Sequence, residues 1–243
     1  MLDARTATWT DVKAAIQRGC VALIAFGAQE QHGPHAPLAT DTIMAAGLAT
    51  RLAERIDGLL LPPIPYGEAW NNSRFPGTVS ISPQTAQALI TDIALSLKNS
   101  GVKALIVVNG HFGNRAPIVK ACNVLKKEHS FPMLQLDYPG FQELAARICE
   151  SKPVQYGLYH ADEVETSMVL ALEPETIKME RAAAEYPVFP DNFLTEPVYL
   201  DSFNTSGVFG DPRPATAEKG EILLQGLTDA AMQVIESFLK GIE

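Results

Sequence analysis

The sequence of 243 residues contains only three cysteines, Cys20, Cys122 and Cys149, which are far apart and form no Cys-x-x-Cys pair. An odd and dispersed set of thiols provides neither a disulfide framework nor a cysteine-based zinc site, so we expect reduced thiols in a cytoplasmic protein. No apolar run is long enough to span a membrane, and the first residues lack the apolar centre of a signal peptide.

Basic residues are also scarce, with 19 Lys and Arg against 28 Asp and Glu, which gives a net charge of −9. Nucleic acids and anionic membranes are bound through basic patches, so we expect neither as a partner. The motifs GxSxG, GxxxxGK[ST] and GxGxxG are absent, which removes the usual signs of a serine hydrolase, a P-loop enzyme and a dinucleotide-binding enzyme. A small-molecule substrate remains the expected partner.

Apolar runs typical of buried strands alternate with segments of helical periodicity along the whole chain. Nothing in the composition marks a boundary, so we expect a single domain over residues 1–243. The alternation predicts an α/β fold with a mostly parallel sheet. The expected strands are residues 21–28, 59–64, 102–108 and 131–136, and the expected helices are residues 10–19, 42–56, 83–99, 114–128, 141–150, 160–172 and 216–240.

The strand expected at residues 21–28 is followed by a cluster of polar residues that includes Glu30, His32 and Asp41. Carboxylates and an imidazole leaving the end of a strand are typical ligands of a divalent metal ion. Glu30 and His32 are two residues apart, so their side chains share one face of an extended chain. Two structural alternatives stay open: Asp41 could cap the following helix, and Glu30 could be a solvated loop acid.

A second polar site follows the strand expected at residues 102–108, where the chain reads NGHFGN and places His111. In parallel α/β sheets, ligands bind at the carboxyl ends of the strands, which favours a role for His111 in binding over a purely structural one. The polar and aromatic segment of residues 66–78 is either an ordinary loop or part of a substrate site.

The segment HADEVETS, which starts at His160, opens the helix expected at residues 160–172. Acidic residues in a first helical turn can simply offset the helix dipole. At about 100° per residue, however, Glu163 would lie roughly 60° around the helix from His160, and Glu165 roughly 140°. We therefore expect Glu163, and not Glu165, to face the same point as His160.

Four segments together resemble the creatininase family of metal-dependent hydrolases: GAQEQHGPHAPLATD, NGHFGN, HADEVETS and GVFGDPRPATAEKG. The resemblance extends from Trp9 to the last helix. It implies a three-layer αβα fold, two divalent metal ions per subunit (zinc, manganese or iron), and a cytoplasmic homo-oligomer, often a hexamer. The slightly positive mean hydropathy agrees with apolar surface buried between subunits.

Carried onto this chain, the resemblance implies that Glu30 and His111 complete one metal site and that His32 and a glutamate complete the other. Asp41 would bridge the two ions. In creatininase proper, that glutamate lies two residues after the histidine of the NGH motif, where this chain has glycine. Glu163, which matches a family glutamate in a HAGE-type motif, would then replace it.

Two departures from the family pattern argue against creatinine as the substrate. One is Gly113, at the position of the missing glutamate, and the other is Asn72, where relatives often carry a histidine. The shared chemistry implied is hydrolysis of an amide, cyclic amide or formamide C–N bond of a small molecule through a hydroxide that bridges the metals. His160 would carry the proton to the leaving nitrogen, with Glu163 beside it.

Two other classes of function stay open. One is a metal-dependent isomerase or C–C hydrolase that acts on a cyclic polyol ketone, and the other is a non-catalytic metal-binding protein. Release of an amine from amides and formamides distinguishes an amidohydrolase from both.

Overall fold

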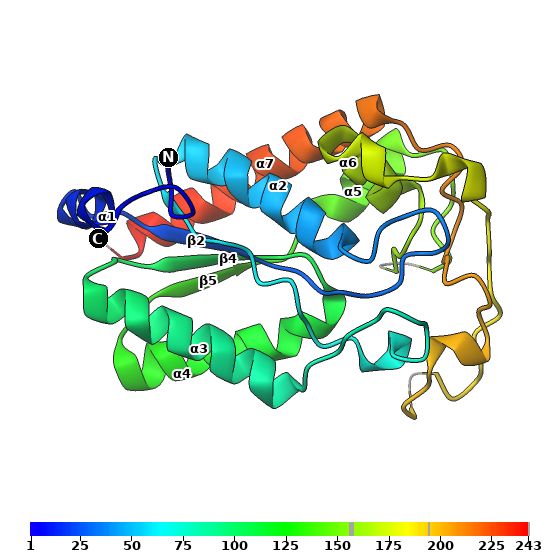
Figure 1. Cartoon of the computed structure of the whole chain (residues 1–243), viewed down its shortest axis with the longest axis horizontal. Coiled ribbons are helices and arrows are strands. Elements are labelled where there is room, and N and C mark those ends of the chain that lie inside the picture. Colours follow the sequence, from blue (N-terminus) through cyan, green and yellow to red (C-terminus); the bar gives the residue numbers. More distant parts are fainter. Residues whose placement is uncertain (156–157, 194, 243) are drawn as a thin grey trace.

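The computed structural model describes residues 1–155, 158–193 and 195–242 (Figure 1). Within these residues, five strands form one sheet in the order β1-β3-β2-β4-β5, and every pair of neighbours is parallel. The parallel sheet predicted from the sequence is therefore confirmed. The strands are β1 (Leu2–Asp3), β2 (Ala22–Phe26), β3 (Leu59–Leu60), β4 (Leu105–Asn109) and β5 (Met133–Leu136).

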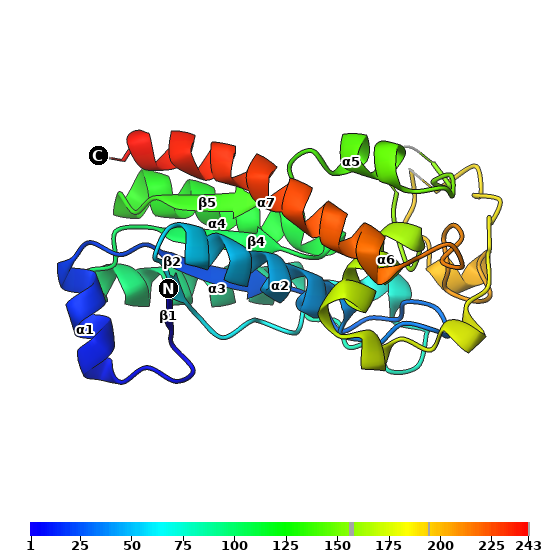
Figure 2. The same cartoon turned by 90° about the horizontal axis from the view of Figure 1, so that it is seen from above.

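Helices cover both faces of the sheet, which confirms the three-layer αβα arrangement (Figures 1 and 2). Helices α3 and α4 lie on one face, and α2, α5, α6 and α7 lie on the other, while α1 packs near the end of the molecule that carries both termini. The helices are α1 (Trp9–Gln17), α2 (Thr40–Arg55), α3 (Pro83–Ser100), α4 (Arg115–His129), α5 (Phe141–Ile148), α6 (Glu163–Leu172) and α7 (Ala217–Lys240).

Strand β2 contributes side chains to two separate hydrophobic cores, one on each face of the sheet. All of its residues are buried, and successive side chains point to opposite faces of the sheet. Leu23 packs with α2, α6 and α7, whereas Ile24 packs with α3 and α4. Burial on both faces is why the sequence of this strand is a continuous apolar run instead of an alternating one.

Strand β3 is shorter than the predicted segment of residues 59–64, because it ends before Pro62 and Pro63. Proline has no backbone N–H to donate to a neighbouring strand. Pairing resumes only at Ile64, which bridges to Phe26 at the end of β2.

The two central strands end together, since Phe26 of β2 is paired with Asn109 of β4. The loops that leave these strands run toward the end of the molecule opposite the termini, on the right of Figure 1. Segments that are distant in the sequence meet there, as the ligand-binding position of a parallel sheet requires.

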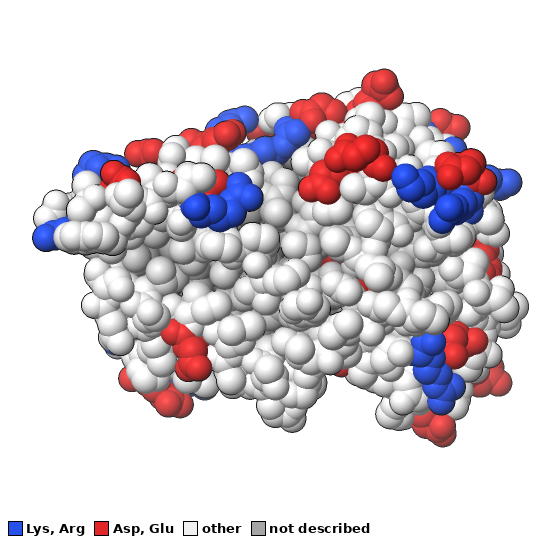
Figure 3. Space-filling model, viewed as in Figure 1, with Lys and Arg blue, Asp and Glu red and all other residues white. Residues whose placement is uncertain are grey.

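On the face shown in Figure 3, charged side chains border a wide uncharged band and form no large basic patch. No helix in the described ranges is both long and apolar enough to cross a membrane.

Candidate metal centre

Asp41 lies at the centre of a buried cluster of carboxylates and imidazoles. Its Oδ1 is 3.2 Å from Nε2 of His32, and its Oδ2 is 3.1 Å from Nδ1 of His111. Asp41 belongs to the first turn of α2, but no side chain caps that helix, so the alternative that Asp41 is a helix cap is wrong. Its two oxygens face two different histidines.

The described residues include three groups of three potential ligands. Two of them contain Asp41, and the third consists of Glu30, His32 and His160. In the first group, Glu30 places Oε1 3.1 Å from Nδ1 of His111. In the second, His32 places Nε2 3.5 Å from Oε2 of Glu165. The ligand atoms within each group lie within 4.8 Å of one another, close enough to surround one ion.

Backbone carbonyls orient both histidines. Nδ1 of His32 is 3.1 Å from the carbonyl oxygen of Glu30, and Nε2 of His111 is 2.7 Å from that of Glu68. A carbonyl oxygen can only accept a hydrogen bond, so each of these ring nitrogens must donate its N–H. The opposite nitrogen of each neutral ring then keeps a lone pair that faces the carboxylates, which is the state of a metal-binding histidine.

Two atoms at the centre are buried without a hydrogen bond to another described residue, namely Nε2 of His32 and Oδ2 of Asp41. Buried polar atoms normally have a partner, and leaving one without costs roughly 1–3 kcal/mol. A divalent cation would satisfy both atoms at once, and a mixture of imidazole and carboxylate ligands suits zinc, manganese or iron. The residues present therefore fit a metal ion.

The electrostatics of the cluster also favour a bound cation. Burial alone would lower the pKa of His32, but the carboxylates of Asp41, Glu165 and Glu30 outweigh it and raise that pKa to about 10. The pKa of His111 is likewise raised well above its usual value by Glu30 and Asp41, against the effect of burial. Burial raises the pKa of Glu165 to about 8. Without a cation, the cluster therefore holds protons at pH 7.

Metal binding at pH 7 should consequently release protons, because an ion and a proton compete for the same lone pairs. We expect release of more than about one proton per chain when zinc binds. Since the pKa values of His32 and Glu165 lie above 7, affinity for zinc should rise as the pH increases from 6 to 9. Calorimetric titration in two buffers of different ionisation enthalpy measures the proton release, and none in either buffer would contradict this assignment.

Glu163 lies outside the cluster, and the prediction that it joins the cluster in place of Glu165 is wrong. Its carboxylate accepts hydrogen bonds from Nζ of Lys219 at 2.6 Å and from the backbone N–H groups of Glu150 and Ser151 at 3.0 and 2.7 Å. These contacts satisfy the carboxylate on the α7 side of α6.

The helix α6 begins at Glu163 and not at His160, which is why the prediction from helical phase is wrong. Asp162 caps the helix in an extended conformation, and Ala161 has a φ angle of +53°, so His160 cannot be placed by counting helical turns. Within the helix, Glu163 and Glu165 are about 200° apart, which allows only one of them to face the cluster.

His160 lies beside the cluster, as predicted, although it reaches this position from an extended segment that bridges to Phe209. Its ring centre is 4.4 Å from that of His32, and its Nδ1 is 3.7 Å from Oε1 of Glu30. Burial, together with the neighbouring His32, lowers the pKa of His160 to about 4. The side chain is therefore neutral at pH 7.

Gln31 fixes the tautomer of His160 through an amide whose orientation follows from its partners. Its Oε1 accepts from the backbone N–H of Gly33 at 2.9 Å, and its Nε2 lies 3.2 Å from the carbonyl oxygen of Gly207. Nε2 also donates to Oδ1 of Asn72 at 3.0 Å, and Asn72 in turn donates to Oε2 of Glu30 at 2.8 Å. Flipping either amide would place two donors or two acceptors face to face.

Nε2 of Gln31 also lies 2.8 Å from Nε2 of His160. An amide nitrogen cannot accept, so this ring nitrogen must be the acceptor, and the proton of neutral His160 sits on Nδ1. That N–H group faces Glu30. No pattern in the sequence indicates a role for Gln31, and Asn72 is conspicuous only as a departure from the family pattern, since side-chain amides carry no metal-ligand signal.

Comparison with known proteins agrees with the fold and with the binding of divalent metal ions. The model of the creatininase family, described as creatinine amidohydrolase, matches residues 5–235. The chain belongs to the creatininase family. It is 30% identical to the creatinine amidohydrolase of Pseudomonas putida, over 92% of this chain and 93% of the relative. It is 29% identical to the mycofactocin precursor peptide peptidase of Mycobacterium tuberculosis (strain ATCC 25618 / H37Rv), over 89% of this chain and 85% of the relative.

Solved creatininase structures share the whole fold. A crystal structure of creatinine amidohydrolase superposes with a TM-score of 0.88 at 28% identity and covers 97% of both chains. A manganese creatininase superposes equally well, with a TM-score of 0.88 at 27% identity and 98% of both chains covered. A mutant creatininase described as Zn–Zn type gives a TM-score of 0.87 at 27% identity, over 97% of this chain and 98% of that one.

Steric crowding explains why this chain has a glycine at position 113, where it departs from the creatininase pattern. A Cβ atom at Gly113 would lie 1.9 Å from the carbonyl oxygen of Glu68, which is the acceptor that orients His111, and 2.8 Å from the Glu68 carboxylate. Glycine is thus needed for this close approach. The space beside His111 is filled by Glu68, from the segment of residues 66–78.

We expect Gly113→Ala to destabilise the protein by about 1–3 kcal/mol, because the methyl group must push the backbone of Glu68 away. The loss of the carbonyl acceptor should also weaken metal binding by about 10–100-fold. Thermal unfolding and a zinc titration measure both effects. Gly241→Ala is the control, since a Cβ there meets no atom closer than 3.4 Å; equal behaviour of the two variants would contradict the steric account.

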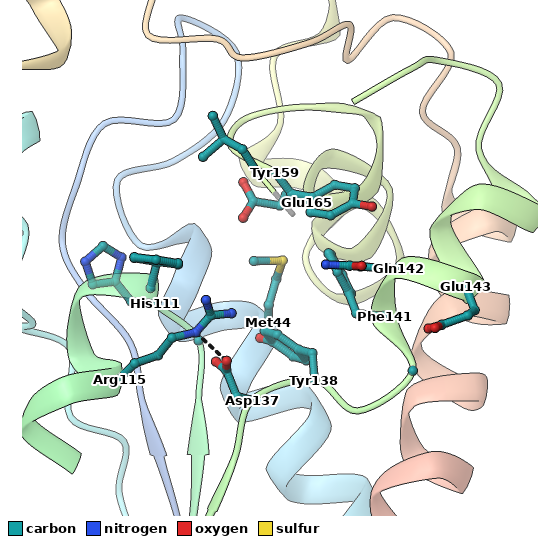
Figure 4. A pocket seen from close by; sticks show the side chains of 14 residues that line it. Met44, His111, Arg115, Asp137, Tyr138, Phe141, Gln142, Glu143, Tyr159 and Glu165 are labelled. Atoms are coloured by element: carbon teal, nitrogen blue, oxygen red, sulfur yellow. Dashed lines mark ion pairs between the residues drawn. The ribbon is translucent and has the colours of Figure 1, made fainter. Parts of the chain in front are cut away.

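Two cavities meet at the cluster. The larger, of about 740 Å³, is lined by Glu30, Asp41, His160 and apolar side chains such as Trp70 and Phe209. The smaller, of about 280 Å³, lies between α2, α4, α5 and α6 (Figure 4). Because residues of the 66–78 segment line the larger cavity, its interpretation as part of a binding site is favoured over that of an ordinary loop.

Proposed function

We propose that this protein is a hydrolase that holds two divalent metal ions and cleaves the C–N bond of a small amide, cyclic amide or formamide. The observation that carries the proposal is the position of Asp41, whose two oxygens each face a different histidine. One ion would be held by Glu30, Asp41 and His111, and the other by His32, Asp41 and Glu165. Creatininase structures with manganese and of Zn–Zn type support the choice of metals.

Ions at these positions would polarise the amide carbonyl and lower the pKa of a water molecule toward neutrality. His160 supplies the proton transfer. The proton that the attacking water releases, as its hydroxyl group joins the acyl carbon, would pass to the neutral ring. The imidazolium then donates Nδ1–H, which faces the cluster, to the nitrogen that leaves, and the ring is neutral again at the end of the reaction.

A second candidate is hydrolysis of a C–C bond, or isomerisation, in a cyclic polyol ketone. It is favoured by one relative, the 3-dehydro-scyllo-inosose hydrolase of Thermotoga maritima, which is 26% identical over 98% of this chain and 85% of the relative. A non-catalytic metal-binding role is the third, and the complete set of ligands argues against it.

Amine release distinguishes these candidates. Protein loaded separately with zinc, manganese and iron would be tested on a panel of formamides, cyclic amides and short peptides, with chelator-treated protein as control. We expect amine release that requires metal. Turnover of cyclic polyol ketones without any amine release from the panel would favour the second candidate.

The variant His160→Asn should retain both ions and lose at least about a hundredfold in kcat, since proton transfer typically contributes about 10²–10⁴-fold in rate. Elemental analysis and steady-state kinetics measure the two quantities. If the variant instead loses metal and recovers its full rate with excess ion, His160 only orients a ligand.

We also propose that the chain acts as a cytoplasmic homo-oligomer, such as a hexamer, as the family resemblance implies. Sedimentation velocity measures the oligomeric state directly, and a monomer at micromolar concentration would contradict it.

A further inference from the structure

Arg115 is the only Lys or Arg among the residues described as lining the two cavities. It is the first residue of α4 and belongs to the walls of both cavities, as do His111 and Glu165 of the cluster. Figure 4 shows its guanidinium group pointing into the smaller cavity, between His111 and Asp137. The remaining charged residues in these walls are acidic or histidines.

Two neighbours hold the Arg115 side chain in place. Its Nε is paired with a carboxylate oxygen of Asp137, and its guanidinium carbon lies 4.3 Å from the ring centre of Phe112. Asp137 is itself held by Nδ2 of Asn109 at 3.0 Å. The two terminal nitrogens of Arg115 carry four further N–H groups, and none of these has a hydrogen-bond acceptor among the described residues.

Structural stability gives little reason for an arginine at this position. The first turn of a helix lies at the positive end of the dipole, which disfavours a cation there by about 0.3–1 kcal/mol. The side chain is half-exposed, and an ion pair of that kind contributes only about 0–1 kcal/mol. A residue that is unfavourable for its local structure and adds little stability, as Arg115 is in the first turn of α4, is expected mainly at functional sites.

We propose that Arg115 binds a carboxylate group of the substrate while the amide lies at the metal cluster. This inference rests on the proposed function and narrows its substrate class to small amides that carry a carboxylate, such as N-acyl amino acids or carboxylated cyclic amides. The planar guanidinium group offers paired N–H donors that match the two oxygens of a carboxylate. The ion pair with Asp137 and the contact with Phe112 orient those donors in advance.

The test compares two matched probes, N-formylglycine and N-formylglycinamide. The first carries a carboxylate where the second carries a neutral amide. Calorimetry would measure their binding to zinc-loaded wild type, to Arg115→Met and to Arg213→Met. Methionine retains an apolar stem against Phe112. Arg213 is the matched control, because it pairs through Nε with Asp211 at 2.8 Å and lines neither cavity.

Wild type and Arg213→Met should prefer the acid by at least about tenfold, and Arg115→Met should lose most of that preference. An equal preference in Arg115→Met would show that the metal ions alone attract the acid and would overturn the proposal, as would equal binding of both probes by wild type. The same samples, assayed for amine release, test the proposed function separately. If the preference for the acid depends on Arg115 but no amine is released, the carboxylate site is supported and the proposed amidohydrolase activity is rejected.

Discussion

Asp41→Ala should reduce the bound metal from about two ions per chain to one or fewer and abolish hydrolysis. Asp41 is the only residue shared by the two proposed sites, which are the group of Glu30, Asp41 and His111 and the group of His32, Asp41 and Glu165. Removing its carboxylate deletes one ligand from each site, and the positive charges of two ions would then lie close together with no anion between them. Elemental analysis after dialysis, with amine release from the best substrate, measures both losses.

The control for this experiment is Asp162→Asn. Asp162 is also buried, but its carboxylate accepts from the backbone N–H groups of Val164 and Glu165 as the cap of α6. Asparagine caps a helix about as well as aspartate, so this variant should keep its metal. Full metal occupancy in Asp41→Ala would contradict the assignment of Asp41 as a shared ligand.

Glu165→Gln should weaken binding of the second ion by at least about tenfold and abolish most of the activity, whereas Glu163→Gln should leave both ions bound. Of these two glutamates, Glu165 has a carboxylate oxygen 3.5 Å from Nε2 of His32, whereas Glu163 is paired with Lys219 at 2.6 Å. The two variants make the same chemical change two residues apart, so each is the matched control of the other. Competition with a zinc chelator measures the affinity of the weaker site.

Glu163→Gln should affect the stability of the fold instead of metal binding. Removing the negative charge leaves Lys219 with a weaker partner and should lower the free energy of unfolding by about 1.5–3 kcal/mol, the typical contribution of a hydrogen bond to a charged group. Denaturant unfolding measures that change. If metal affinity fell in Glu163→Gln and not in Glu165→Gln, the placement of α6 beside the cluster would be wrong.

The sequence could predict the sheet and the first metal ligands because both depend on short-range patterns. The apolar runs around Leu23 and Val107 are buried on both faces, and such runs are distinct even in a single sequence. Glu30, His32 and His111 follow directly from strand ends, where a parallel sheet gathers its ligands. Their position therefore required no knowledge of helix packing.

The choice between Glu163 and Glu165 could not be predicted in the same way. It depends on where α6 begins, and that depends on the capping of Asp162 and on the left-handed conformation of Ala161. Alanine gives no warning of a positive φ angle, which is uncommon for any residue other than glycine. Asp162 itself was a usable signal, because Asp is a strong helix cap.

The roles of Gln31, Asn72 and Glu68 depend on contacts between segments that are distant in the sequence, such as the hydrogen bond between Gln31 and Asn72. No local pattern indicates which amide will lie against which imidazole. The absence of a glutamate at Gly113 was visible in the sequence, but its cause, the approach of the Glu68 carbonyl, was visible only in the fold.

We propose that one buried cluster, shared through Asp41, holds two ions. Calorimetric titration of metal-free protein with zinc at pH 8 tests it most directly. We predict an end point at about two ions per chain in the wild type. An end point at one ion or none, in protein that remains folded throughout the titration, would contradict the account.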